Sequence, residues 1–190
     1  MFQAKKEYVK SGIPIYGGKN TEVATGGFTL DDAAYVTEGE IIPAGTPIGF
    51  SEATRKAMVC KLGVAQANAA NNATTYKVLK GHLLKVGMEI NSGAGTARAI
   101  TVIDTTNADY DTLTVGTTIG VAVTAGDSIF VSDAGYTGLK GLLYEDAVIG
   151  SNAIADVSVV LHGTVYARRI TPVPATIQAK LPLIIFSQSF

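Results

Sequence analysis

The chain has 190 residues, a length that fits one domain or two small ones. Hydrophobic residues make up 47% of it and charged residues 16%, which argues against disorder, because disordered chains combine low hydrophobicity with high charge. The formal net charge of −1 provides no basic field for nucleic acid. The single cysteine, Cys60, excludes a disulfide within the chain. So few charges indicate that an assembly partner covers part of the surface.

Targeting and membrane segments are not expected. No apolar run follows the N-terminal lysines, and the late apolar stretch Leu183–Phe186 is far shorter than the roughly 20 residues that a membrane helix needs. We therefore expect synthesis in a cytoplasm and no membrane contact.

Residues 1–30 are predicted to form an extended N-terminal arm. Its segment Gly12–Gly18 is apolar but interrupted by glycine and proline, so we expect no helix there and little strand length. Such an arm suits contact with a partner, and the candidate interface residues are Tyr8, Ile13, Pro14, Ile15 and Tyr16. Thr29–Asp32 then predicts a weak helix start, with Thr29 as the cap.

The rest of the chain is typical of strands and turns. Residues 39–62 indicate a strand, a turn at Pro43–Gly45, and two further strands. The Ala/Asn-rich residues 64–73 predict a linker or exposed loop, with a short helix as the alternative. Residues 74–131 predict a second β unit, in which 99–103 and 110–115 flank a polar turn and form a hairpin.

The clearest pair of strands lies near the C-terminus, at residues 139–144 and 157–165. Proline then becomes frequent, and 176–181 is expected to form one or two helical turns. The predicted fold class is mainly β.

No sequence motif supports catalysis or a cofactor. Gly12–Asn20 lacks the spacing and the hydroxyl of a phosphate loop. Gly93–Arg98 has no third glycine, so we favour a hairpin loop over a dinucleotide site. Neither His82 nor His162 accompanies a nucleophile motif, and we expect each to be a hydrogen-bonded strand histidine. We therefore predict no catalytic and no cofactor-binding residues, and a protein that is not an enzyme.

A calcium site is the one metal alternative that the sequence raises. Asp104, Asn107, Asp109 and Asp111 are calcium-type ligands, but their spacing departs from the EF-hand and the terminal glutamate is missing. Aspartate and asparagine also populate ordinary turns, which is the preferred interpretation. We predict no metal ligands.

Two segments resemble the lambda-type head decoration family of bacteriophages. They are Ile42–Gly49, which contains the Ala-Gly-Thr turn, and Gly141–Ala147 with the later Val159–Val165 and Arg169. The longer layout is similar to head fibre proteins of crAss-like phages that infect gut Bacteroidales. That likeness covers nearly the whole chain, and it rests on the order of motifs such as Gly12–Gly18, Lys80–His82, Ile100–Asp104 and Asp109–Val115.

The resemblance implies a structural virion protein on the outer surface of the capsid. Its implied partners are the major capsid protein and two further copies in a homotrimer, while attachment of a distal fibre protein does not follow from the sequence. It also implies a layout, with a small barrel- or sandwich-like decoration unit from residues 31–62 and 137–175, an inserted β unit at 63–136, and a C-terminal tail at 176–190. No nucleic acid is expected.

A second function stays open alongside this one. The alternative is a virion-surface module that binds host or mucosal glycans. The 8 tyrosines are compatible with sugar binding, while the absence of tryptophan weakens it. Neither the capsid axis nor the oligomeric state follows from the sequence.

Overall fold

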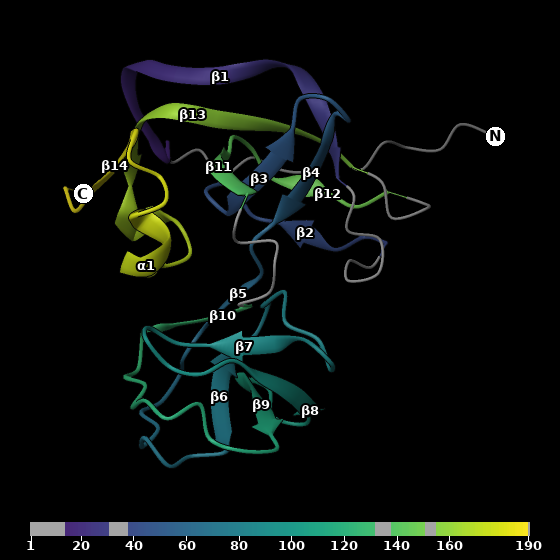
Figure 1. Ribbon diagram of the computed structural model, residues 1–190, viewed down its shortest axis with the longest axis vertical. Helices are drawn as coiled ribbons and strands as arrows, with labels where there is room; N and C mark the ends of the chain where they lie inside the picture. Colours follow the sequence, from purple (N-terminus) through teal and green to yellow (C-terminus); the bar gives the residue numbers. More distant parts are fainter. Residues whose placement is uncertain (1–13, 31–37, 132–137, 151–154, 190) are drawn as a thin grey trace.

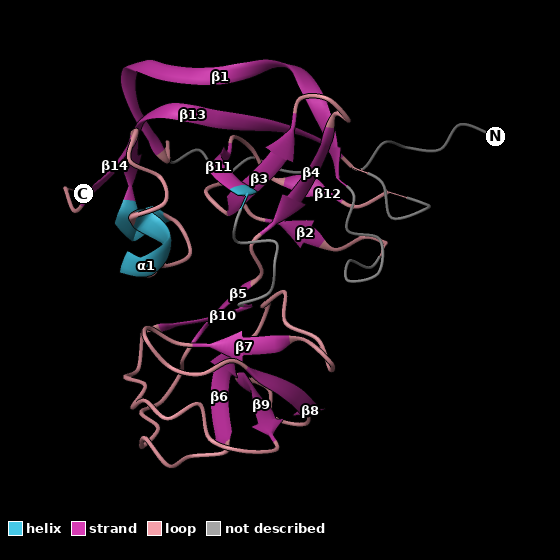
Figure 2. Ribbon diagram, in the orientation of Figure 1, coloured by secondary structure: helices cyan, strands magenta, loops and turns pink. Residues whose placement is uncertain are grey.

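The computed structural model describes residues 14–30, 38–131, 138–150 and 155–189 (Figure 1). The predicted mainly β fold is confirmed. The strands form two six-stranded sheets, one in the upper and one in the lower lobe of Figure 2, and a short two-stranded sheet. A 3-10 turn at Ala167–Arg169 and the helix α1 at Ala175–Gln178 accompany them. No helix in the described ranges is long and apolar enough to cross a membrane.

The first sheet is built from the two ends of the chain. Its strand order is β1-β4-β3-β11-β13-β14. The two-stranded sheet, β2 with β12, lies beside it in the upper lobe (Figure 1). The strands are β1 Tyr16–Leu30, β2 Ile41–Ile42, β3 Pro47–Ser51, β4 Lys56–Val59, β11 Leu139–Leu143, β12 Ala147–Val148, β13 Asp156–Tyr166 and β14 Ile184–Ser187.

Five strands of this sheet close into a small barrel. β1 pairs with β4 in parallel at Thr29↔Lys56 and with β13 antiparallel from Tyr16↔Val165 onward. These two pairings join the ends of the series β4-β3-β11-β13, and β14 then adds in parallel beside β13. Closure pairs strand edges that would otherwise offer free N–H and C=O groups.

The N-terminal segment differs from its prediction where it is described. Tyr16–Leu30 is a 15-residue strand, so the expectation of little strand length fails from Tyr16 onward. The helix start expected at Thr29 is also wrong, because Thr29 pairs with both Asp156 and Lys56 inside the barrel. Tertiary pairing overrides the local capping signal here. Residues 1–13 and 31–37 lie outside the described ranges.

The second sheet comes from the middle of the chain, in the order β5-β10-β7-β8-β9-β6. The predicted hairpin is confirmed as β8 with β9, paired from Ile100↔Val115 to Asp104↔Thr112. Alternating burial along β6 and β9 shows one face toward the core and one toward solvent. The strands are β5 Leu62–Val64, β6 Thr75–Leu79, β7 Glu89–Asn91, β8 Arg98–Asp104, β9 Tyr110–Val115 and β10 Ser128–Val131.

The ends of the second sheet also meet. Ala65, directly after β5, forms an antiparallel bridge with Val78 of β6. The Gln66 N–H donates to the Lys77 carbonyl at 2.8 Å beside it. The Ala/Asn-rich residues 64–73 form a loop and no helix, with strand bridges at Ala65 and Ala69. The loop is not exposed throughout, because Val64 belongs to β5, Ala65 is buried, and Ala69 and Ala73 pack against the core.

The buried side chains form two hydrophobic clusters, and one of them spans both lobes. One buried cluster fills the upper barrel around Phe28, Ile48 and Leu143. The other runs from the lower sheet into the C-terminal segment, where Ile177 and Leu181 are 1% and 2% exposed. The helical turn predicted at 176–181 is present as α1, and its buried side chains pack into this core. Whether the predicted units are separate domains stays a prediction.

The turn between β2 and β3 depends on Gly45. The Thr46 N–H donates to the Pro43 carbonyl at 3.3 Å, as the turn prediction requires, and Gly45 has a φ of +81°. A Cβ at this position would also overlap the Ile170 side chain. Both the conformation and the space therefore require glycine.

We predict that Gly45→Ala lowers the free energy of unfolding by about 2–4 kcal/mol. Left-handed backbone costs alanine roughly 1–2 kcal/mol, and the clash with Ile170 adds the cost of overpacking. Gly39→Ala is the matched control, because Gly39 has the same φ of +81° and a Cβ there would meet no atom within 4 Å. Urea unfolding of both variants measures the difference, and equal losses would contradict a role for the Ile170 contact.

Candidate functional site

The two decoration-like segments lie side by side, although Ala44 and Asp146 are 102 positions apart in sequence. Pro47 of β3 pairs with Leu142 of β11, and β2 pairs with β12. At the turn, the Gly45 N–H donates to the Leu143 carbonyl at 2.8 Å, and the Ala44 N–H donates to Asp146 Oδ1 at 2.8 Å. The segments that carry the resemblance therefore form one continuous structural element.

The predicted interface residues are held against their own barrel where they are described. Tyr8 and Ile13 lie outside the described residues. Pro14 is exposed, and its carbonyl accepts a hydrogen bond from Arg169 at 2.6 Å. Ile15 packs against the core. The Tyr16 hydroxyl donates to the Leu143 carbonyl, and burial raises the pKa of this hydroxyl.

Tyr144 lies next to the predicted interface residue Tyr16, and the sequence does not indicate it as an interface residue. Its ring stacks on that of Tyr16 with centroids 5.8 Å apart, and the residue is 44% exposed. No sequence signal marks it, because Tyr16 and Tyr144 meet only through the barrel. The interface assignment to Pro14–Tyr16 stays a prediction.

A second surface lies on the hairpin of β3 and β4. Arg55 ends the loop with a φ of +57° and is the one non-glycine residue of the described chain with positive φ. Its backbone N–H donates to the Ser51 carbonyl at 2.8 Å, and its carbonyl accepts from the Thr29 N–H at 2.9 Å. The loop conformation is therefore fixed both within the hairpin and against β1.

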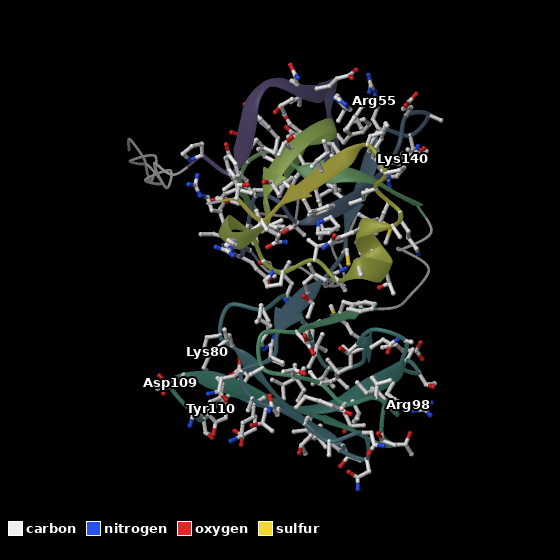
Figure 3. The ribbon with its side chains drawn as sticks, turned by 90° about the vertical axis from the view of Figure 1, so that its left-hand side faces the viewer. Arg55, Lys80, Arg98, Asp109, Tyr110 and Lys140 are labelled. Atoms are coloured by element: carbon white, nitrogen blue, oxygen red, sulfur yellow. The ribbon has the colours of Figure 1, made fainter. Side chains whose placement is uncertain are left out.

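The Arg55 side chain lies over one ring of an aromatic pair. The Phe28 and Phe50 rings lie with their centroids 4.2 Å apart. The Arg55 guanidinium carbon is 5.4 Å from the centre of the Phe28 ring, and Lys140 Nζ is 4.8 Å from that of Phe50. Both cations lie on the upper lobe in Figure 3. We call this surface the Arg55 surface.

An open hollow belongs to the Arg55 surface. It has a volume of about 330 Å³, and its lining is Ala24, Phe28, Phe50, Glu52, Arg55 and Leu161. Its lining combines apolar side chains with one acid and one guanidinium. Hollows of this size are large enough for one or two side chains of a partner.

Packing alone gives no reason for arginine at position 55. Left-handed backbone costs a non-glycine residue roughly 1–2 kcal/mol. An exposed cation–π contact stabilises the folded protein by only about 0.5–1 kcal/mol. The stabilisation from the contact with Phe28 is therefore smaller than the conformational cost of the left-handed backbone at Arg55.

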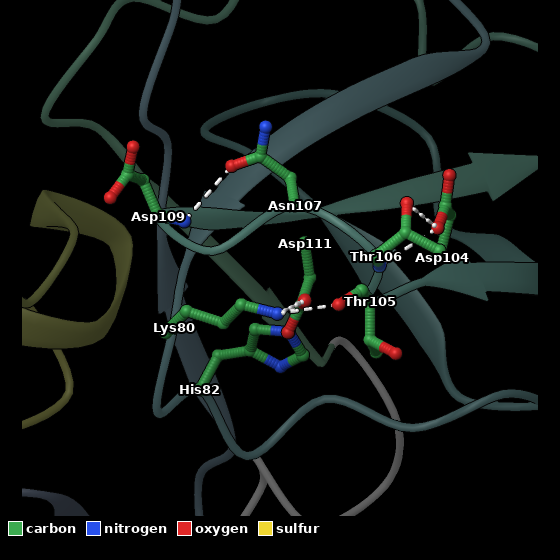
Figure 4. Close-up of polar contacts among 8 residues, drawn as sticks. All are labelled: Lys80, His82, Asp104, Thr105, Thr106, Asn107, Asp109 and Asp111. Carbon is green, nitrogen blue, oxygen red and sulfur yellow. Dashed lines mark hydrogen bonds and ion pairs between the residues drawn. The ribbon is translucent and has the colours of Figure 1, made fainter.

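The polar turn of the lower lobe holds its side chains in local bonds (Figure 4). Asp104 Oδ1 accepts from the N–H and the hydroxyl of Thr106, which lowers the pKa of this carboxyl. Asn107 Oδ1 accepts from the Asp109 N–H at 2.9 Å. Among the described residues, no three His, Cys, Asp or Glu side chains are placed so that they could hold a metal ion. The geometry is that of the ordinary turn.

Asp111 lies apart from that turn, with its side chain only 10% exposed. One carboxylate oxygen pairs with Lys80, and the other is 3.1 Å from His82 Nε2. Lys80 also donates to the Thr105 carbonyl at 3.0 Å. This cluster joins β9 to the segment after β6 and closes the end of the hairpin (Figure 4).

The tautomer of His82 follows from its neighbours. The Leu84 N–H donates to Nδ1 at 3.1 Å, so the ring proton is on Nε2 and is donated to Asp111. Burial lowers the pKa of His82, and it outweighs the opposing effect of the Asp111 charge. A second proton on Nδ1 would face the Leu84 N–H. His82 is thus a neutral, hydrogen-bonded residue, as expected, but it lies in the loop after β6 and not in a strand, so that part of the expectation is wrong. The other histidine, His162, is exposed on β13.

Comparison with known proteins gives no identification: no protein-family model, curated protein or solved structure matches this chain.

We predict that Arg55→Gly is more stable than Arg55→Ala by about 1 kcal/mol, because only glycine relieves the left-handed conformation. Arg55→Ala should lie about 0.5–1 kcal/mol below the parent, through loss of the contact with Phe28. Ala53→Gly, in the same loop but without a positive φ, is the control and should destabilise the protein. Urea unfolding measures all three variants. If glycine and alanine at position 55 gave equal stability, the strain argument would be wrong.

We predict that stability decreases as the pH falls below 6.5, the ordinary pKa of histidine. Below pH 6.5 His82 binds a proton in the unfolded chain, whereas in the folded protein its lowered pKa keeps it neutral. The contribution of His82 to the free energy of unfolding is therefore complete above pH 6.5 and is lost as the pH falls toward the lower folded-state pKa. His82→Gln should flatten the pH dependence of the unfolding free energy between about pH 5 and 7.5.

His162→Gln is the control for this measurement, since that side chain is exposed. Its profile should follow that of the parent protein. A His82→Gln profile as steep as the parent profile would refute the role of His82.

Proposed function

We propose that this protein is a structural subunit on the outer surface of a bacteriophage head, as a head fibre or decoration protein. One observation carries the proposal. The segments that resemble the lambda-type decoration family, which are remote in sequence, pair directly through β3 with β11 and β2 with β12. A chance likeness of short turn motifs gives no reason for the motifs to meet in one barrel.

The exposed apolar side chains support an assembled role. Leu183 and Ile185 are 59% and 63% exposed, and Ile185 lies in β14 at the open edge of the first sheet. Tyr144 adds a partly exposed aromatic ring. Apolar side chains at a sheet edge favour association with another protein surface.

The proposed partners are the major capsid protein and further copies of this chain in a homotrimer. A shell repeats its binding site many times, so a trimer that engages several sites gains affinity without strong single contacts. A distal fibre protein is a further proposed partner.

Immunogold electron microscopy of phage particles from a lysate that contains this protein tests the proposal. We expect gold distributed over the icosahedral head. Preimmune serum on the same particles gives the background. Gold at the tail tip, or no labelled particles, would refute a head subunit and favour host binding, including the glycan-binding alternative.

A further inference from the structure

We propose that the Arg55 surface is the contact by which this protein holds its partner, and that it receives an acidic peptide segment of the capsid protein. The inference rests on the proposed function and names the surface and the chemistry of the contact. The segment would place a carboxylate on Arg55 and an apolar side chain in the hollow against Ala24 and Leu161, with further negative charge toward Lys140, which lies over the Phe50 ring.

The charge of the surface selects an anion. Neither Arg55 nor Lys140 forms an ion pair with any acid of the described residues, and each instead lies over a phenylalanine ring. A cation held over a ring keeps its N–H donors free for a second partner. The guanidinium fork binds carboxylates by two parallel hydrogen bonds.

Glu52 limits what the hollow accepts. It is the one acid in the lining, it is exposed, and it forms no ion pair with Arg55. A carboxylate that enters the hollow is attracted by Arg55 and repelled by Glu52, so it is directed toward the guanidinium. Removal of the Glu52 charge should therefore strengthen binding, which distinguishes a carboxylate ligand from a neutral one.

The lining favours a peptide over a sugar or a nucleic acid. Sugars stack on open aromatic faces, whereas Phe28 and Phe50 are only 2% and 9% exposed. Nucleic acid requires a broad basic field, which a chain with a net charge of −1 lacks. An apolar floor beside a guanidinium suits a peptide in which an acidic residue adjoins an apolar one.

The backbone prepares Arg55 for this contact. Its carbonyl accepts a hydrogen bond from the Thr29 N–H of β1, and its own N–H donates to the Ser51 carbonyl. The backbone that carries the side chain is therefore held in place. A site held in advance loses less conformational entropy on binding. A left-handed conformation whose cost exceeds the stabilisation from the contacts of its side chain is typical of a functional position.

Binding of purified protein to phage heads stripped of it tests the inference, with co-sedimentation as the readout. Arg55→Gly should raise the Kd at least about tenfold, the usual effect of losing a paired charge at an interface. Lys140→Gln should weaken binding in the same direction, and Glu52→Gln should strengthen it. Unfolding midpoints show whether each variant is folded. If Arg55→Gly does not fold, the inference is tested by the opposite changes in Kd that we expect of Lys140→Gln and Glu52→Gln.

Lys77→Gln is the matched control. Lys77 also lies over an aromatic ring, with its Nζ 4.6 Å from the centre of the Tyr110 ring, but Tyr110 belongs to the lower lobe (Figure 3). Its loss should leave the Kd unchanged. Poly-L-glutamate should displace the protein from the heads, and dextran should not.

The outcomes separate the two proposals. If the parent protein does not sediment with heads, the proposed function fails. If the parent binds and Arg55→Gly binds equally well, the head contact lies elsewhere and this inference is wrong. Displacement by dextran and not by poly-L-glutamate would overturn the acidic peptide as the ligand.

Discussion

The fold depends on the hydrogen bonding of β13 to three other strands. Along one edge it pairs with β1, and along the other it pairs first with β11 and then with β14. These partners come from residues 16–30, 139–143 and 184–187, so β13 brings both ends of the chain into one barrel. Such pairings close long loops, and their entropic cost must be met before the contacts form. The barrel therefore cannot form from either end of the chain alone.

This closure explains why the middle of the chain tolerates a second sheet. β4 and β11 leave and re-enter the first sheet on either side of the segment that forms β5 to β10. The lower sheet joins its own ends through Ala65 and Val78, and it shares its core with Val165, Ile177 and Leu181. The C-terminal segment thus stabilises both lobes, since its apolar side chains fill the space between the barrel and the lower sheet.

Local signals predicted what is local in this structure. The hairpin of β8 and β9, the turn at Pro43–Gly45 and the short helix α1 follow from residues close in sequence. The same signals failed at Thr29, where pairing with β4 and β13 overrides the helix cap. The Arg55 surface was beyond sequence reasoning, because Phe28, Arg55 and Lys140 come together only through the pairing of the barrel strands, and a positive φ at arginine has no sequence signature.

The Arg55 surface also shows why charge composition alone is a weak guide to binding. With a net charge of −1, the chain offers no attraction at long range. Recognition then depends on where single charges are held. Arg55 and Lys140 are held over adjacent rings by the barrel, while Lys80 and Asp111 neutralise each other in the lower lobe. Lys77 of the lower lobe is a single cation over the Tyr110 ring, whereas Arg55 and Lys140 lie over two rings that contact each other, so we infer the contact on the upper lobe.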